Sequence, residues 1–243
     1  MYGYGTMIGI GLFAGWAMAE YRARRQSLAA EHVLHLVIWC AAGGFLGAKL
    51  LFLLTEWKTI LQTPKEMIYM LADGFVVFGG ILGGIPAGYL YCKKEGLSFL
   101  QWFDLLIPSV ALGQGFGRIG CFLAGCCYGK ATNSRFSVIF PASDYAPAGI
   151  ALIPVQLYAA FLDFLLMGAL LWIASRKKEE GVTAASYLIL YSFGRFWLEF
   201  LRGDPERGMA GWLSTSQIIS VLTFSSGLLL FLRIKRKKVP MDS

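Results

Sequence analysis

Seven long apolar stretches, separated by short polar segments, form the main pattern of this chain. A helix that crosses the hydrocarbon core of a membrane needs about 20 mostly apolar residues. Stretches of that length occupy residues 3–20, 33–55, 70–92, 99–122, 154–175, 184–202 and 212–233. Glycines in the third and fourth stretches and charges in the sixth make these three less apolar. The pattern predicts an all-α integral membrane protein with seven transmembrane helices, in which residues 1–243 form a single domain.

The composition excludes an ordinary soluble domain, because 56% of the residues are hydrophobic and only 15% are charged. The net charge of +7 could suggest a nucleic-acid partner, but more than half of the 22 basic residues fall in short clusters after the first, third, fifth and seventh stretches. These clusters are Arg22, Arg24 and Arg25; Lys93 and Lys94; Arg176, Lys177 and Lys178; and Arg233, Lys235, Arg236, Lys237 and Lys238. Since basic loops stay in the cytoplasm, we expect no nucleic-acid partner, an outside N-terminus and a cytoplasmic C-terminus.

This topology places the two longest polar segments, residues 56–68 and 124–153, on the outer side of the membrane. The second forms a small extracytoplasmic loop region, which we expect to lie over a site. No Lys or Arg precedes the first apolar stretch, so we expect a retained helix and not a cleaved signal peptide.

Glycines recur at close spacing in the second and third stretches. They are Gly43, Gly44, Gly47, Gly79, Gly80, Gly83, Gly84 and Gly88. Small residues at such spacing let helix backbones approach closely in lipid, so most of these glycines predict helix packing.

A permanent positive charge, Arg118, lies among glycines near the outer end of the fourth stretch. A charge there costs free energy, which favours a functional role. Glycines allow close approach of a ligand, and a guanidinium can bind a phosphate through two parallel hydrogen bonds. Gln114, one helical turn earlier, is a candidate to orient Arg118.

The sixth stretch carries Arg195, Glu199 and Arg202 at positions i, i+4 and i+7, so we expect them to share one helical face. An ion pair between Arg195 and Glu199 would lower the cost of both charges. Arg202 is then left at about the depth of Arg118, so the two arginines predict an anion clamp, unless Asp204 neutralises Arg202. Tyr4, at the outer start of the first stretch, could reach the same site.

Three of the five cysteines, Cys121, Cys126 and Cys127, cluster at the outer end of the fourth stretch. Structural thiols or a disulfide are the favoured interpretations there, with a reactive thiol as an alternative. Their spacing is not a usual zinc pattern, and His32 and His35 lie near the opposite face. We therefore expect no metal and no cofactor.

The run GRIGCFLAGCCYG at residues 117–129 resembles the signature of bacterial prolipoprotein diacylglyceryl transferases. Further similarity spans nearly the whole chain. It includes Tyr4 and Gly5, residues 47–50, Gly79, Gly80 and Gly83, Asp104, Pro108 and Gln114, residues 154–158 and residues 195–205.

The resemblance implies transfer of a diacylglyceryl group from phosphatidylglycerol to the lipobox cysteine thiol of a preprolipoprotein, with release of glycerol 1-phosphate. It implies a multi-pass protein of the bacterial cytoplasmic (inner) membrane, in contact with membrane lipids, whose site faces the outer side. Arg118, Arg202 and Tyr4 are the expected catalytic residues. The expected substrate-binding residues are Arg118, Gly120, Cys121, Gly125, Gly129, Arg195, Glu199, Gln114, Phe78, Gly79 and Gly80.

Four positions depart from the family pattern. Phe78 replaces a histidine, Cys121 an asparagine, Cys126 an acidic residue and Ala159 a glutamate. Phenylalanine cannot carry a proton, so a divergent member or paralogue that uses another acceptor is one alternative. A lipid-binding protein without chemistry, or an anion transporter that uses the three arginines, are the others.

Overall fold

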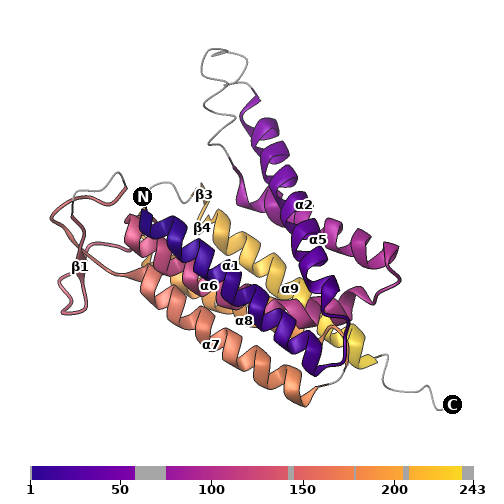
Figure 1. Cartoon of the computed structure of the whole chain (residues 1–243). Helices are drawn as coiled ribbons and strands as arrows, with labels where there is room; N and C mark the ends of the chain where they lie inside the picture. Colours follow the sequence, from indigo (N-terminus) through magenta and orange to yellow (C-terminus); the bar gives the residue numbers. More distant parts are fainter. Residues whose placement is uncertain (1, 58–74, 142–144, 178, 205–207, 237–243) are drawn as a thin grey trace. The chain divides into compact units, whose positions relative to one another are not determined.

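The computed structural model describes residues 2–57, 75–141, 145–177, 179–204 and 208–236 (Figure 1). Within these ranges, seven long helices make up most of the chain. They are α1 (Tyr2–Arg25), α2 (Glu31–Thr55), α5 (Val77–Lys94), α6 (Phe99–Ala124), α7 (Val155–Arg176), α8 (Val182–Leu198) and α9 (Thr215–Arg236). Four of them, α2, α6, α7 and α9, are long and apolar enough to cross a membrane. The structure therefore confirms a helical protein of the membrane type.

Several predicted helix boundaries differ from those in the structure. The first helix continues to Arg25, five residues past its predicted end. The sixth helix does not reach residue 202, because α8 ends at Leu198 and is followed by the single 3-10 turn η1 (Glu199–Leu201). Arg202 is extended, with φ −70° and ψ 140°. It forms an antiparallel bridge with Gly129, so pairing with the 124–153 segment replaces a further helical turn.

The seventh helix begins at Thr215, three residues later than predicted. The preceding residues form a short antiparallel hairpin of β3 (Met209–Ala210) and β4 (Leu213–Ser214). The third stretch is described only from residue 75, and its helix begins at Val77; the predicted residues 70–74 lie outside the described ranges.

The chain divides into two compact units, Glu20–Trp102 and the combination of Met1–Ala19 with Phe103–Ser243. In the first, α2 and α5 pack backbone against backbone through glycines. A Cβ atom built on Gly83 would lie 2.2 Å from the carbonyl oxygen of Gly43, and one on Gly47 would lie 2.3 Å from that of Gly79. No side chain fits at these distances, so the prediction of close helix packing is confirmed.

In the second unit, α7, α8 and α9 lie side by side (Figure 1). Its core joins three helices through Ile107 and Ala111 of α6, Leu166 and Leu170 of α7, and Tyr187 of α8. Buried apolar side chains hold these helices together.

Asp104 of α6 fixes the beginning of α8. Its two carboxylate oxygens accept hydrogen bonds from the backbone N–H groups of Gly181 and Ala184, each at 2.7 Å. The first N–H groups of a helix have no partner within the helix, and a carboxylate there also interacts favourably with the helix dipole. Asp104 therefore sets the position of α8 relative to α6.

The 124–153 segment carries a two-stranded antiparallel ribbon of β1 (Val138–Ile139) and β2 (Ala151–Leu152). Phe140, Ala146 and Leu152 form a small buried cluster there, against which Phe122 of α6 packs. The segment is therefore attached to the end of α6 that carries the glycine-rich run.

Candidate functional site

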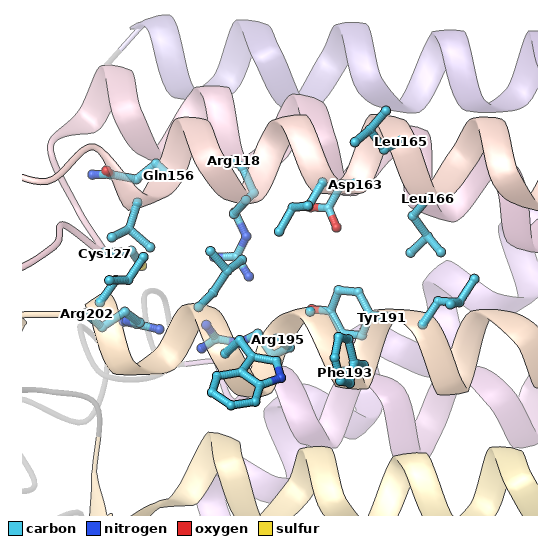
Figure 2. Close-up of a pocket in the computed structure, with 18 of the residues that line it drawn as sticks. Arg118, Cys127, Gln156, Asp163, Leu165, Leu166, Tyr191, Phe193, Arg195 and Arg202 are labelled. Carbon is cyan, nitrogen blue, oxygen red and sulfur yellow. The ribbon is translucent and has the colours of Figure 1, made fainter. Parts of the chain in front are cut away.

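A cavity of about 550 Å³ lies within the second unit, between α6, α7 and α8. One end is polar and holds Arg118, Cys127, Gln156, Arg195 and Arg202, as Figure 2 shows. The other end is apolar. It is lined by residues such as Leu165 and Leu166, as Figure 2 shows. A cavity divided in this way suits a ligand with an anionic head and a hydrocarbon tail.

Three arginines from two regions of the chain converge at the polar end. Arg118 projects from α6 towards α8, which carries Arg195, and Arg202 follows η1 (Figure 2). The predicted convergence of Arg118 and Arg202 on one cavity is confirmed. Their combined charge provides a strong field for an anion.

Glu199 lies between two of these arginines and is only 1% exposed. Its Oε2 atom lies 2.8 Å from Arg195 Nη2 and 3.9 Å from Arg202 Nη1. The predicted ion pair of Arg195 and Glu199 is therefore confirmed. Arg195 also donates a hydrogen bond to Ser216 Oγ, at 3.1 Å, which ties α8 to α9.

Arg202 pairs with a carboxylate, so the structure shows the alternative in which Asp204 neutralises this arginine. Its Nε donates to Asp204 Oδ1 at 2.8 Å, and its Nη2 pairs with the other oxygen of the same carboxylate. Arg202 is extended and Gly203 lies outside any helix, and in this conformation the Asp204 carboxylate reaches the Arg202 guanidinium. Asp204 thereby orients the guanidinium and neutralises part of its charge.

Arg118 differs from the other two arginines. Within the described residues, no hydrogen bond or ion pair reaches its guanidinium. Asp163 of α7, which also lines the cavity, acts on it electrostatically without forming an ion pair. Arg118 therefore keeps all five of its N–H donors for a ligand.

The three clustered cysteines lie at the polar end of the site. All are free thiols, and their sulfur atoms lie within 4.8 Å of one another. The α6 helix ends in a tight turn, in which Gly125 has φ 75° and Cys127 has φ 58°. This left-handed turn brings Cys126 and Cys127 back towards Cys121 and places Cys127 on the cavity wall.

The environment of the thiols separates their acidities. The pKa of the Cys127 thiol is lowered, because hydrogen bonding from Cys121 and Cys126 stabilises its thiolate. Burial raises this pKa, and the positive charges of Arg202 and Arg118 lower it further. The pKa of Cys126 is raised by the same contacts with Cys121 and Cys127 and by burial. Cys127 is therefore the thiol that ionises first.

Gly129 joins Arg202 to the 124–153 segment. Its N–H donates to the carbonyl of Ile153. Gly129 also forms a bridge with Arg202, in which the Lys130 N–H donates to the Leu201 carbonyl and the Gly203 N–H donates to the Tyr128 carbonyl. A Cβ atom at Gly129 would lie 2.5 Å from the Ile153 carbonyl oxygen. Only glycine fits at this contact, which fixes Arg202 at the cavity.

Two other predicted site residues lie beside the cavity without lining it. Tyr4 of α1 packs on Gly120, where an added Cβ atom would lie 3.1 Å from the tyrosine ring. In the described part of the chain, Gln114 accepts a hydrogen bond from the Tyr187 hydroxyl at 3.0 Å and makes none to Arg118. Both therefore contact the helices that frame the cavity.

Three of the predicted residues belong to the other unit. Phe78, Gly79 and Gly80 lie in the first turn of α5, and the two glycines pack against α2. The Phe78 side chain is 39% exposed. Their contribution to the site stays a prediction.

Sequence reasoning missed Gln156 and Tyr191 as cavity residues, and it gave Asp163 no role. Gln156 is 1% exposed, and its Nε2 donates a hydrogen bond to the Cys126 carbonyl at 2.8 Å. Its buried Oε1 accepts no hydrogen bond within the described residues. Gln156 and Asp163 are polar residues inside a strongly apolar helix, which is the signal that identified Arg118.

The helices define a helical protein of the membrane type, and its cavity suits an anionic, lipid-like ligand. A comparison with protein families matches residues 1–233 to the model described as "Prolipoprotein diacylglyceryl transferase". The chain belongs to this family.

Several relatives support the assignment along the whole chain. The phosphatidylglycerol–prolipoprotein diacylglyceryl transferase of Clostridium tetani is 45% identical over 231 residues, which cover 95% of this chain and 92% of the relative. The second such transferase of Clostridium perfringens is 43% identical over 95% of this chain and 90% of its own length. The corresponding protein of Finegoldia magna is 30% identical over 98% of this chain and 93% of its own length.

Proposed function

We propose that this protein transfers a diacylglyceryl group from phosphatidylglycerol to the lipobox cysteine of a preprolipoprotein and releases glycerol 1-phosphate. The observation that carries the proposal is the cavity itself, which combines an arginine-rich end with an apolar end. The family membership and the names of the relatives agree with it.

The apolar end suits the acyl chains, and Arg118 binds the phosphate. Its free N–H donors match phosphate oxygens, and Arg202, oriented by Asp204, provides a second positive charge. Negative charge accumulates on the phosphate as the ester bond breaks, so fixed guanidinium groups stabilise the transition state.

The reaction joins the acceptor sulfur to the terminal glyceryl carbon of the diacylglyceryl group. The bond between that carbon and the phosphate oxygen breaks, and its electron pair leaves with glycerol 1-phosphate. The thiolate is the attacking species, and with a reference pKa of about 8.5 only a few per cent of a free thiol is ionised at neutral pH. Cys127, on the cavity wall near the two arginines, lies where the acceptor must approach.

We propose that all seven helices cross the cytoplasmic membrane as a single domain, with the N-terminus and the site outside. The basic clusters at the ends of α1, α5, α7 and α9 support this orientation. Tyr4, Gly120 and the start of α5 then belong to the outer half of the protein. Reporter fusions after each helix test the topology, and an outside signal from a C-terminal fusion would overturn it.

Incubation of the purified protein with radiolabelled phosphatidylglycerol and a lipobox peptide tests the activity. We expect labelled peptide with the parent protein and a loss of at least about 100-fold with Arg118→Ala. Arg24→Ala, at an exposed arginine in the last turn of α1, is the control and should change the activity little. Lipid turnover without labelled peptide would point to another acceptor, and no turnover at all would refute transfer.

A further inference from the structure

The three thiols at the end of α6 form a cluster that the proposed reaction does not by itself require. Cys121, Cys126 and Cys127 are the described residues that gather as possible metal ligands, with their sulfurs within 4.8 Å of one another. From their geometry and surroundings we propose that they bind a soft divalent cation such as Zn²⁺ through three thiolates, and that its open fourth position takes the acceptor thiol. The second part rests on the proposed function.

The distances suit thiolate coordination. A zinc–sulfur bond is about 2.3 Å, so two sulfurs on one tetrahedral zinc lie about 3.8 Å apart. Sulfurs within 4.8 Å reach this spacing by small side-chain rotations. The spacing of these cysteines in the sequence is unlike the usual zinc patterns, but the left-handed turn at Gly125 and Cys127 brings the thiols together.

The backbone that carries the thiols is fixed. The Cys126 N–H donates to the Cys121 carbonyl at 3.1 Å, and the Cys126 carbonyl accepts from Gln156 Nε2 at 2.8 Å. Gln156 is 1% exposed and belongs to a different helix, α7. A fixed backbone reduces the conformational entropy that metal binding would otherwise cost.

The charges also suit a three-thiolate site. Three thiolates and one divalent cation carry a net charge of −1, and Arg118 and Arg202 both act electrostatically on Cys127. The arginines therefore favour the metal-bound, deprotonated form of the cluster. No fourth protein ligand belongs to the group within the described residues.

An open coordination position gives the site a chemical role. Cys127 lines the cavity together with Arg118 and Arg202, so a metal on its sulfur faces the space where phosphate and acceptor meet. A metal ion deprotonates a coordinating thiol, and the proton passes to water. The bound thiolate attacks the glyceryl carbon, the carbon–oxygen bond breaks, and the electron pair leaves with glycerol 1-phosphate.

Cobalt titration of the full-length protein in detergent tests the site. The reduced protein is first stripped of metal with a chelator. We expect one equivalent of Co²⁺ to produce thiolate-to-cobalt charge-transfer absorption, which Zn²⁺ abolishes by displacement. Cys121→Ser and Cys126→Ser should lose the absorption, whereas Cys40→Ser, on α2, should keep it. Absence of the absorption from the parent protein would overturn the proposal.

A second measurement avoids the risk that a variant fails to fold. Zn²⁺ should slow alkylation of Cys127 by iodoacetamide in the parent protein at least about tenfold, and an unchanged rate would overturn the metal site. A lipobox peptide should change the cobalt spectrum, whereas the same peptide with serine in place of cysteine should not. An unchanged spectrum with the cysteine peptide would refute the fourth-ligand role.

The labelled-lipid assay separates this proposal from the proposed function. Equal transfer by the metal-free and the zinc-loaded protein would refute the role of the metal while the transferase function stands. A cobalt spectrum that responds to the peptide, without any transfer of lipid, would support the site while the proposed function fails.

Discussion

Glu199→Gln removes one buried negative charge and keeps the size of the side chain. Glu199 is 1% exposed and lies 2.8 Å from Arg195 and 3.9 Å from Arg202. The substitution leaves two largely buried arginines facing an uncharged group. We therefore expect a marked loss of stability.

The distances give the scale of the effect. With an effective dielectric constant of about 20, attraction to the nearer arginine is about 6 kcal/mol and to the farther one about 4 kcal/mol. Desolvation of the three charges offsets most of this sum, and removal of one partner from a buried pair costs about 3–5 kcal/mol. We expect a decrease of about that size in the free energy of unfolding.

Unfolding in increasing SDS, followed by tryptophan fluorescence, measures the change. Glu20→Gln provides a matched control, because Glu20 also pairs with an arginine four residues away, Arg24, at 2.6 Å. The Arg24 side chain is 71% exposed, so loss of that pair should cost less than about 1 kcal/mol. If Glu199→Gln costs no more than Glu20→Gln, the reasoning about the buried charge is wrong. A double-mutant cycle with Arg195→Met should then show no coupling energy.

Three further predictions concern positions around the site. Gly129→Ala should lower both the stability and the lipid transfer, because the added Cβ atom would lie 2.5 Å from a backbone oxygen. Gly168→Ala on α7 is the control and should be tolerated, because a Cβ atom there meets nothing within 4 Å. Equal melting temperatures for the two variants would contradict this prediction. Asp104→Asn should cost about 2–3 kcal/mol in SDS unfolding, since one charge-assisted bond to the α8 N-terminus becomes neutral and the other loses its acceptor. In metal-free protein, iodoacetamide should alkylate Cys127 at nearly the same rate at about pH 6 and about pH 8, because its lowered pKa keeps the thiol ionised. Cys126 should react slowly at both pH values, because its pKa is raised. Peptide mass spectrometry checks this order, and faster reaction of Cys126 would refute it.

The sequence was most informative where a residue conflicts with its surroundings. Arg118 and the pair of Arg195 and Glu199 are charges in apolar stretches; the two arginines line the cavity, and Glu199 pairs with Arg195. The same rule applied to α7 would have identified Gln156 and Asp163. The helix-packing glycines were also predictable, because small residues at helical spacing allow backbone contact.

Boundaries that depend on long-range pairing were not predictable. The α8 helix ends before Arg202 because this residue pairs with Gly129, more than 70 positions away in the chain. The early end of the helix is also what lets Asp204 reach Arg202. Local helix propensity contains no information about such a partner.

The sequence alone therefore determined the class of the protein, its helical stretches and the charged residues of its site, because the hydrophobic effect and the cost of charges in lipid act on residue types and their spacing. The tertiary structure decided which of these charges neutralise one another and which remain for a ligand. Among the described residues, Arg118 makes no ion pair, whereas Arg202 pairs with Asp204 and lies close to Glu199. The fold also brings three cysteines with an unusual spacing together as a compact cluster of thiols. These outcomes depend on distances between segments remote in the chain, which only packing of the helices and of the 124–153 segment establishes.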